Sequence, residues 1–231
     1  MTDRPRGAPG LLLAGLAVFV LVTVDVVAGG PLSRLDVRVS DWTRARGLAG
    51  ARVLDLLTEF GDRAEVGPLV GLGTAWLAWR ARTVVPLARL AVLALLTAGL
   101  VSAFKVGIHR PPPGELLRWS DAPRSYPSGH TATAVVLWGL LATLVAEHGP
   151  PALLRRATRL FAVVASLVTM AAMVLGGYHW LADVLGAAGL GVFLLQAESL
   201  ALRHWRDARR GSSARPGRVA AGDHPVRPGG R

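Results

Sequence analysis

The stretch Arg124-Ser-Tyr-Pro-Ser-Gly-His130, followed by the apolar run from Thr131 to Ala146, sets the organisation of this chain. Its serine, glycine and histidine stand at the start of a predicted membrane-spanning helix. The first backbone N–H groups of a helix lack partners within the helix and, together with the helix dipole, favour an anion. Gly129 allows an anion to approach the backbone, and a histidine beside an anion is typical of proton transfer. For this segment alone, a helix cap with an incidental histidine is an equally good interpretation.

Composition indicates a polytopic membrane protein. Of the 231 residues, 52% are hydrophobic and 18% are charged, and the mean hydropathy is +0.41. Soluble domains carry about 25% charged residues. The net charge of +11 comes almost entirely from arginine. In a membrane protein such charge reports topology and contact with anionic lipids, so we predict membrane lipids and no nucleic acid as partners.

Several chemistries are absent from the sequence. The chain has no cysteine, which excludes disulfides, thiolate metal sites and a cysteine nucleophile. It also contains no metal-ligand motif, Walker loop or dinucleotide fingerprint. We therefore expect neither a metal nor a cofactor.

Six apolar runs predict an all-α fold with six transmembrane helices. A helix needs about 20 apolar residues to cross a bilayer, so the second run is short. The first run is interpreted as a retained span because it is long for a signal peptide. The runs are 11–28, 66–79, 84–104, 131–146, 160–177 and 182–202. The predicted organisation is a polar segment over 1–9, a six-helix domain over 10–202, and a basic, disordered tail over 203–231.

The loop over 31–65 is amphipathic. Apolar residues recur in it at helical spacing, as at Leu32, Leu35, Val39 and Trp42. This pattern predicts one or two interfacial helices, and an ordinary helical loop packed on the bundle fits it equally well.

Arginine placement predicts the orientation in the cell membrane. Six spans put both termini on one side, together with the turns at Arg80–Arg82 and Arg155–Arg159. The positive-inside rule assigns that side to the cytoplasm. The loop over 31–65 also contains several arginines although it falls on the outside, so this pattern is not uniform.

Three polar groups meet on the opposite, extracytoplasmic face. Lys105 and Arg110 follow the third span, the Ser-Gly-His sequence opens the fourth, and His179 and Asp183 join the fifth to the sixth. The i, i+4 spacing of His179 and Asp183 puts both on one helix face. The aspartate can accept the Nδ1–H of the imidazole, which leaves Nε2 free for nucleophilic attack.

These residues match a known family. The chain resembles the type 2 phosphatidic acid phosphatases, or lipid phosphate phosphatases, over roughly residues 10–202. That family has three motifs: Lys followed after six residues by Arg-Pro; Pro-Ser-Gly-His; and Ser-Arg followed after five residues by His and after three more by Asp. The second motif is intact at 127–130, and the third retains His179 and Asp183.

Two motif arginines are absent from their usual positions. Pro112 stands where the first motif has arginine, and Arg110 lies two residues earlier. Ala172-Met173 replaces the Ser-Arg pair of the third motif. A charge-assisted hydrogen bond contributes about 1.5–3 kcal/mol, so two unreplaced losses lower the rate about 10²- to 10⁴-fold.

The resemblance implies the catalytic roles. His179 is expected to be the nucleophile that forms a phosphohistidine, with Asp183 orienting it. His130 is expected to protonate the leaving alkoxide and then to activate water. No metal is expected, because cationic side chains and helix ends supply the positive field.

The resemblance also implies that Lys105, Ser128 and the Gly129 N–H hold the phosphoryl oxygens. As a substitute for a missing motif arginine we suggest Arg110, which is our own assignment. Further candidates for the same role are Arg124 and Arg118.

The expected function is an integral membrane phosphatase that acts on a lipid phosphate or diphosphate at the extracytoplasmic face. An undecaprenyl or other polyprenyl diphosphate, or a phosphatidyl-type lipid, fits a site at the level of the spans. A phosphotransferase on the same scaffold is an open alternative. A non-catalytic relative that binds lipid head groups is another, supported by the absent arginines. No paired broken helices or inverted repeats favour a transporter.

Overall fold

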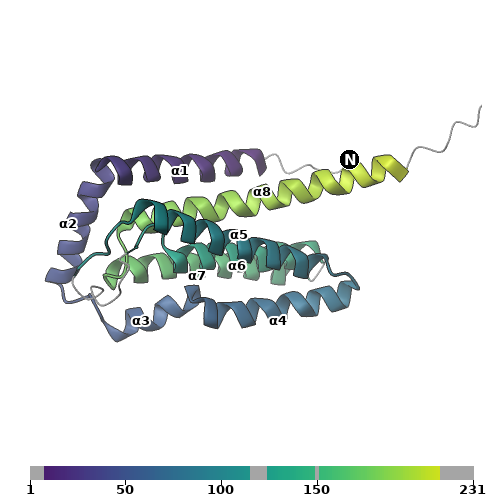
Figure 1. Ribbon diagram of the computed structural model, residues 1–231. Coiled ribbons are helices and arrows are strands. Elements are labelled where there is room, and N and C mark those ends of the chain that lie inside the picture. The colour runs from purple at the N-terminus through teal and green to yellow at the C-terminus, as the bar shows by residue number, and fades with distance from the viewer. Residues whose placement is uncertain (1–7, 115–123, 149–150, 214–231) are drawn as a thin grey trace, which may run out of the picture.

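The computed structural model describes residues 8–114, 124–148 and 151–213, and within them it contains helices and no strands. The helices run along one bundle, except for α2, which crosses one of its ends (Figure 1). The elements are α1 (Ala8–Ala28), α2 (Pro31–Ala45), α3 (Arg52–Thr58), a 3₁₀ turn η1 (Glu59–Gly61), α4 (Arg63–Ala81), α5 (Val85–Ile108), α6 (Gly129–Glu147), α7 (Ala152–Leu175) and α8 (Leu181–Ser213). The predicted all-α fold is confirmed.

Helix α6 is the centre of the bundle. Of its apolar stretch, 61% is buried, against 17% to 39% in the other four apolar helices. It packs against α4, α5, α7 and α8. The helix that begins at the proposed anion site is therefore the one most completely surrounded by protein.

Helices α1 and α8 approach each other closely through glycines. A Cβ at Gly15 would lie 2.8 Å from the Phe193 backbone nitrogen, and one at Gly189 would lie 2.8 Å from that of Phe19. Small residues of this kind allow close helix packing in membranes. The first apolar run thus packs as an integral part of the bundle.

Five helices are long and apolar enough to cross a membrane: α1, α5, α6, α7 and α8. The predicted second span lies in α4, whose 19 residues include Arg63, Glu65 and Arg80 and are not among these five. Figure 1 nevertheless shows α4 running alongside the bundle. It exposes large apolar side chains, for example Leu72 at 71% and Trp79 at 77%. The count of six spans remains a prediction.

Helix α2 begins at a carboxylate cap supplied by α1. Asp25 accepts hydrogen bonds from the backbone nitrogens of Leu32 at 3.1 Å and Ser33 at 2.8 Å. These contacts satisfy two of the unpaired N–H groups of the first turn. The chain therefore turns sharply after α1, and α2 lies across the end of the bundle at which α6 and α8 begin (Figure 1).

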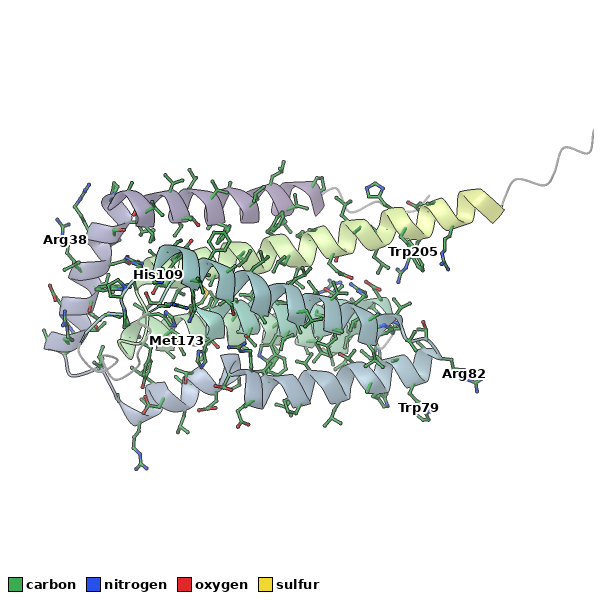
Figure 2. The ribbon with its side chains drawn as sticks, viewed as in Figure 1. Arg38, Trp79, Arg82, His109, Met173 and Trp205 are labelled. Carbon is green, nitrogen blue, oxygen red and sulfur yellow. The ribbon has the colours of Figure 1, made fainter. Side chains whose placement is uncertain are left out.

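The opposite end of the bundle contains a buried ion-pair cluster. Arg89 of α5, only 5% exposed, donates to Glu147 of α6 at 2.9 Å and to Glu198 of α8 at 2.6 Å. Trp79, Arg82 and Trp205 also lie toward this end, whereas Met173 lies within the bundle near α2 (Figure 2). Aromatic and basic residues at one end are typical of a membrane interface.

Helix α8 extends beyond the predicted end of the last span. The sequence analysis places a disordered tail from Arg203 onward, but the helix continues to Ser213. That boundary was therefore wrong, because the arginines of this segment favour a helix although they are charged. The rest of the predicted tail, 214–231, lies outside the described residues.

Candidate active site

Three loops that are distant in sequence are joined by hydrogen bonds at one end of the bundle. The Ser125 backbone nitrogen donates to the Arg110 carbonyl at 2.8 Å, and the Ser128 nitrogen donates to the Asp183 carbonyl at 3.1 Å. Trp180 Nε1 donates to the Pro111 carbonyl at 2.7 Å. The end of α5, the start of α6 and the α7–α8 connection thus form a single structure.

The predicted His179–Asp183 pair is formed. His179 Nδ1 lies 3.2 Å from Asp183 Oδ2, and the Trp180 backbone nitrogen donates to the same oxygen at 3.2 Å. The Asp183 side chain is fully buried and that of His179 is 11% exposed. Gly177 lies between the end of α7 at Leu175 and this pair, and its φ of +76° is a conformation that glycine adopts readily.

The start of α6 has the predicted cap. Ser128 is fully buried, and its Oγ accepts a long hydrogen bond of 3.4 Å from the Thr131 backbone nitrogen. The Ser128 N–H is already used by the Asp183 carbonyl. Within the described part of the chain, the N–H groups of Gly129 and His130 have no recorded acceptor. Two N–H groups at the start of α6 therefore remain available for an anion.

His130 and His179 face the same cavity. Both line a space of about 310 Å³ together with Asp55, Thr58, Glu59, Met173 and Tyr178. His130 Nε2 also lies 3.3 Å from Asp62 Oδ2. The sequence analysis missed Asp62, whose carboxylate also caps α4 through the Ala64 nitrogen at 2.6 Å. Its only signal was an acidic residue a few positions before the apolar run that begins at Val66.

Tyr178 closes one side of this cavity. Its hydroxyl donates to Asp55 Oδ1. This hydrogen bond, followed by burial, raises the pKa of Tyr178 to about 12. The tyrosine therefore stays protonated at neutral pH and presents no anion to the cavity.

Arg110 bridges two buried carboxylates. Its Nη1 donates to Asp183 Oδ1 at 2.6 Å and its Nη2 donates to Asp36 Oδ2 at 2.6 Å. Asp36 Oδ1 accepts from the Ala182 backbone nitrogen at 2.9 Å. Burial raises the pKa of Asp36, and the Arg110 contact opposes that shift.

The sequence analysis did not identify Asp36 as a residue of the site. It lies on α2 one turn after Leu32 and next to Leu35, and it is only 1% exposed. A carboxylate on the apolar face of an amphipathic helix is the signal that was available, since a buried charge requires a partner.

The other cations proposed as phosphate ligands are Lys105, Arg124 and Arg118. The charge of Lys105, at the end of α5, is attracted by Asp183 and repelled by Arg63. Arg124 is partly buried, and its Nε has no partner within the described residues. Arg118 lies outside the described residues.

A second cavity adjoins the start of α6. It measures about 170 Å³, lies between α4, α5 and α6, and is lined mainly by apolar and small side chains. Gly129 and Arg63 are among its lining residues, and on α6 it reaches Leu137. At a rise of about 1.5 Å per residue, it extends about 12 Å along α6 from Gly129.

The comparisons with known proteins agree with this geometry. The model of the PAP2 superfamily matches residues 86–207, which is more than half of the chain. The chain belongs to the PAP2 superfamily. This PAP2 match includes the end of α5, the start of α6 and the His179–Asp183 pair. The predicted relationship to the type 2 phosphatidic acid phosphatases is confirmed.

A solved PAP2 structure has the same fold. The crystal structure of the first transmembrane PAP2-type phosphatidylglycerolphosphate phosphatase from Bacillus subtilis superimposes with a TM-score of 0.71 at 20% identity. The match covers 83% of this chain and 96% of the other. The comparison with curated proteins gives no match.

One replaced motif position of this PAP2 chain lies at the cavity that His130 and His179 line. Met173, which stands where the resemblance predicts arginine, is 2% exposed and lines the cavity shared by His130 and His179. Ala172, in place of the motif serine, is 1% exposed. An apolar side chain therefore replaces a cation beside the two histidines. Within the described residues, no group of three or more His, Asp and Glu side chains is placed to hold a metal ion.

Proposed function

We propose that this PAP2 protein hydrolyses a lipid phosphate or diphosphate through a phosphohistidine intermediate. The family and the fold support a membrane lipid phosphatase. The observation that carries the mechanism is the placement of two histidines on one cavity, one of them held by a buried aspartate.

The first chemical step uses His179 as nucleophile. Its Nδ1–H is directed at Asp183, so Nε2 carries the lone pair that attacks phosphorus. As the N–P bond forms, the bond from phosphorus to the leaving oxygen breaks, and His130 donates a proton to that oxygen. Asp183 stabilises the positive charge that develops on the imidazole.

The second step reverses the proton transfer. His130, now neutral, accepts a proton from a water molecule whose oxygen attacks the phosphohistidine. The N–P bond breaks, inorganic phosphate leaves, and His179 returns to its starting state. Transfer to an alcohol in place of water would give the phosphotransferase alternative.

The phosphoryl oxygens require cations and N–H donors near the start of α6. The free N–H groups of Gly129 and His130 meet this requirement, and Lys105 adds a charge. We add Arg63 to this set, because it lines the cavity beside Gly129 and no carboxylate partner is recorded for it within the described residues. Arg124 remains a further candidate.

We assign Arg110 a role different from the one that its position in the sequence suggested. Each of its two Nη atoms already donates one N–H to a carboxylate at 2.6 Å, so two negative charges offset its positive charge before any phosphate binds. Its geometry favours holding Asp183 in place.

The apolar cavity next to Gly129 supports a substrate with a hydrocarbon tail. A polyprenyl or phosphatidyl-type lipid would place its tail between α4 and α5 while its phosphate meets the histidines. The proposed orientation puts this site on the extracytoplasmic face. A reporter fused after Arg210 should then read as cytoplasmic, and an external readout would invert the topology.

The test is phosphate release from a panel of prenyl diphosphates, phosphatidic acid and phosphatidylglycerol phosphate. His179→Ala should abolish release and also the acid-labile phosphate that labelled substrate leaves on the protein. His148→Ala, at the far end of α6, is the matched control and should retain activity. Near-normal turnover of His179→Ala would exclude the mechanism. Binding of these lipids without any release by the unmodified protein would favour the non-catalytic alternative.

A further inference from the structure

Asp36 connects helix α2 to the proposed nucleophile. Its carboxylate is among the most buried charged groups of the described residues, at 1% exposed. A buried carboxylate is destabilising unless it is paired and hydrogen-bonded. Asp36 meets both conditions, with Arg110 at 2.6 Å on Oδ2 and the Ala182 nitrogen at 2.9 Å on Oδ1.

The contacts form a continuous chain of four side chains. Arg110 donates from Nη2 to Asp36 and from Nη1 to Oδ1 of Asp183. The other oxygen of Asp183, Oδ2, faces Nδ1 of His179. Two carboxylates flank one guanidinium, so the chain presents a net charge of −1 to the imidazole. Without Asp36 this net charge would be zero.

We infer that Asp36 is a positioning residue for the proposed reaction, acting through Arg110 to fix the carboxylate that orients His179. The inference rests on the proposed function, because it assigns Asp36 a part in the same reaction. It differs from a purely structural role in one respect. A structural role would change the amount of folded protein, whereas a positioning role also changes the protonation behaviour of His179.

Asp36→Asn removes the charge of this carboxylate with almost no change of shape. The amide has one oxygen, so it accepts either from the Ala182 nitrogen or from Nη2 of Arg110, and its NH₂ group faces the other donor. In either orientation Arg110 loses its ion pair with position 36, and the net charge of the set falls to zero.

Several other charged or titratable groups surround His179, and none of them is altered by this substitution. Asp55, Glu59, Tyr178 and His130 line the same cavity. Lys105 and Asp62 act electrostatically on His130. Loss of one negative charge from the Asp36–Arg110–Asp183 set disfavours the imidazolium form of His179, so the acid limb of the pH profile should move to lower pH.

The experiment compares Asp36→Asn with Asp41→Asn in the full chain, purified in detergent. Asp41 lies on the same helix, is 65% exposed and pairs only with the exposed Arg44 at 2.7 Å in the described structure. We expect kcat of Asp36→Asn to fall about 10- to 100-fold, the scale on which outer-shell partners act on functional histidines, with little change in KM. Asp41→Asn should behave as the unmodified protein.

Two further measurements separate positioning from folding. In an Arg110→Gln background, Asp36→Asn should have little additional effect on kcat, because both act through the same contact. The pKa of His179, followed by histidine NMR and assigned with His179→Gln, should be lower in Asp36→Asn than in Asp41→Asn.

The outcomes are decisive in both directions. Equal kcat values for the two aspartate variants would overturn the inference. So would a loss of activity that follows the loss of folded protein while the pKa of His179 is unchanged. If the unmodified protein releases no phosphate from any lipid but the pKa of His179 still falls, the proposed function fails and the positioning contact stands.

Discussion

Filling the apolar cavity should change the preference of the enzyme for substrate tail length. Ala98 of α5 lines the cavity between α4, α5 and α6. Replacing it with leucine adds three carbon atoms where the proposed substrate tail would lie. Ala91, on the same helix, is exposed and does not line this cavity, so Ala91→Leu is the matched control. Alanine and leucine have similar helix propensity, which limits effects on folding.

The magnitude follows from the hydrocarbon that is displaced. Each buried CH₂ group contributes about 0.8 kcal/mol when it moves out of water. Three such groups amount to about 2.4 kcal/mol, which corresponds to about a 50-fold loss in kcat/KM. A tail that moves from lipid rather than water gains much less, because the bilayer is as apolar as the cavity. The substrate must therefore be a monomer in solution.

The assay uses octyl phosphate below its micelle concentration and ethyl phosphate as the short reference. Ala98→Leu should lower kcat/KM about 50-fold on octyl phosphate and leave ethyl phosphate nearly unchanged. Ala91→Leu should affect neither. Equal losses on both substrates, or equal effects of the two variants, would show that the tail does not occupy this cavity.

Three other predictions concern single side chains. Arg63→Ala should lower kcat/KM about 10- to 100-fold through loss of a charge-assisted contact with the phosphate. Arg52, on the exposed surface of α3, is the control, and an equal effect of Arg52→Ala would show that Arg63 is not a phosphate ligand. Burial raises the pKa of Tyr126 to about 12, and the hydrogen bond to Asp55 raises the pKa of Tyr178 to about 12. Ultraviolet titration should therefore show that neither of the chain's two tyrosines is ionised at about pH 11. Because unfolded tyrosine titrates near pH 10, the contribution of both to stability is present below that pH and is lost as the pH rises through 12. Arg89→Ala should lower the free energy of unfolding by about 3–5 kcal/mol, since it leaves Glu198 without Arg89 and Glu147 with only the longer 3.6 Å contact to Arg206. An unchanged denaturation midpoint in detergent would contradict this.

Local patterns in the sequence predicted the helices, the His179–Asp183 contact and the cap of α6. The apolar runs predicted helices because a membrane requires every backbone polar group to be paired within its own segment. The spacing of His179 and Asp183 predicted their contact, since residues four apart share a helix face. The position of Ser128 before an apolar run predicted the cap of α6. Each of these inferences depends only on residues within one helix or directly next to it.

The partners of the charged groups were decided by tertiary structure. Arg110 contacts carboxylates 73 and 74 residues away, and Asp36 reaches the start of α8 across 146 residues. A guanidinium binds phosphate and carboxylate with the same geometry, so the sequence around Arg110 did not distinguish these partners. Which of them it meets depends on how α2 docks across the end of the bundle, and helical periodicity carries no information on that docking.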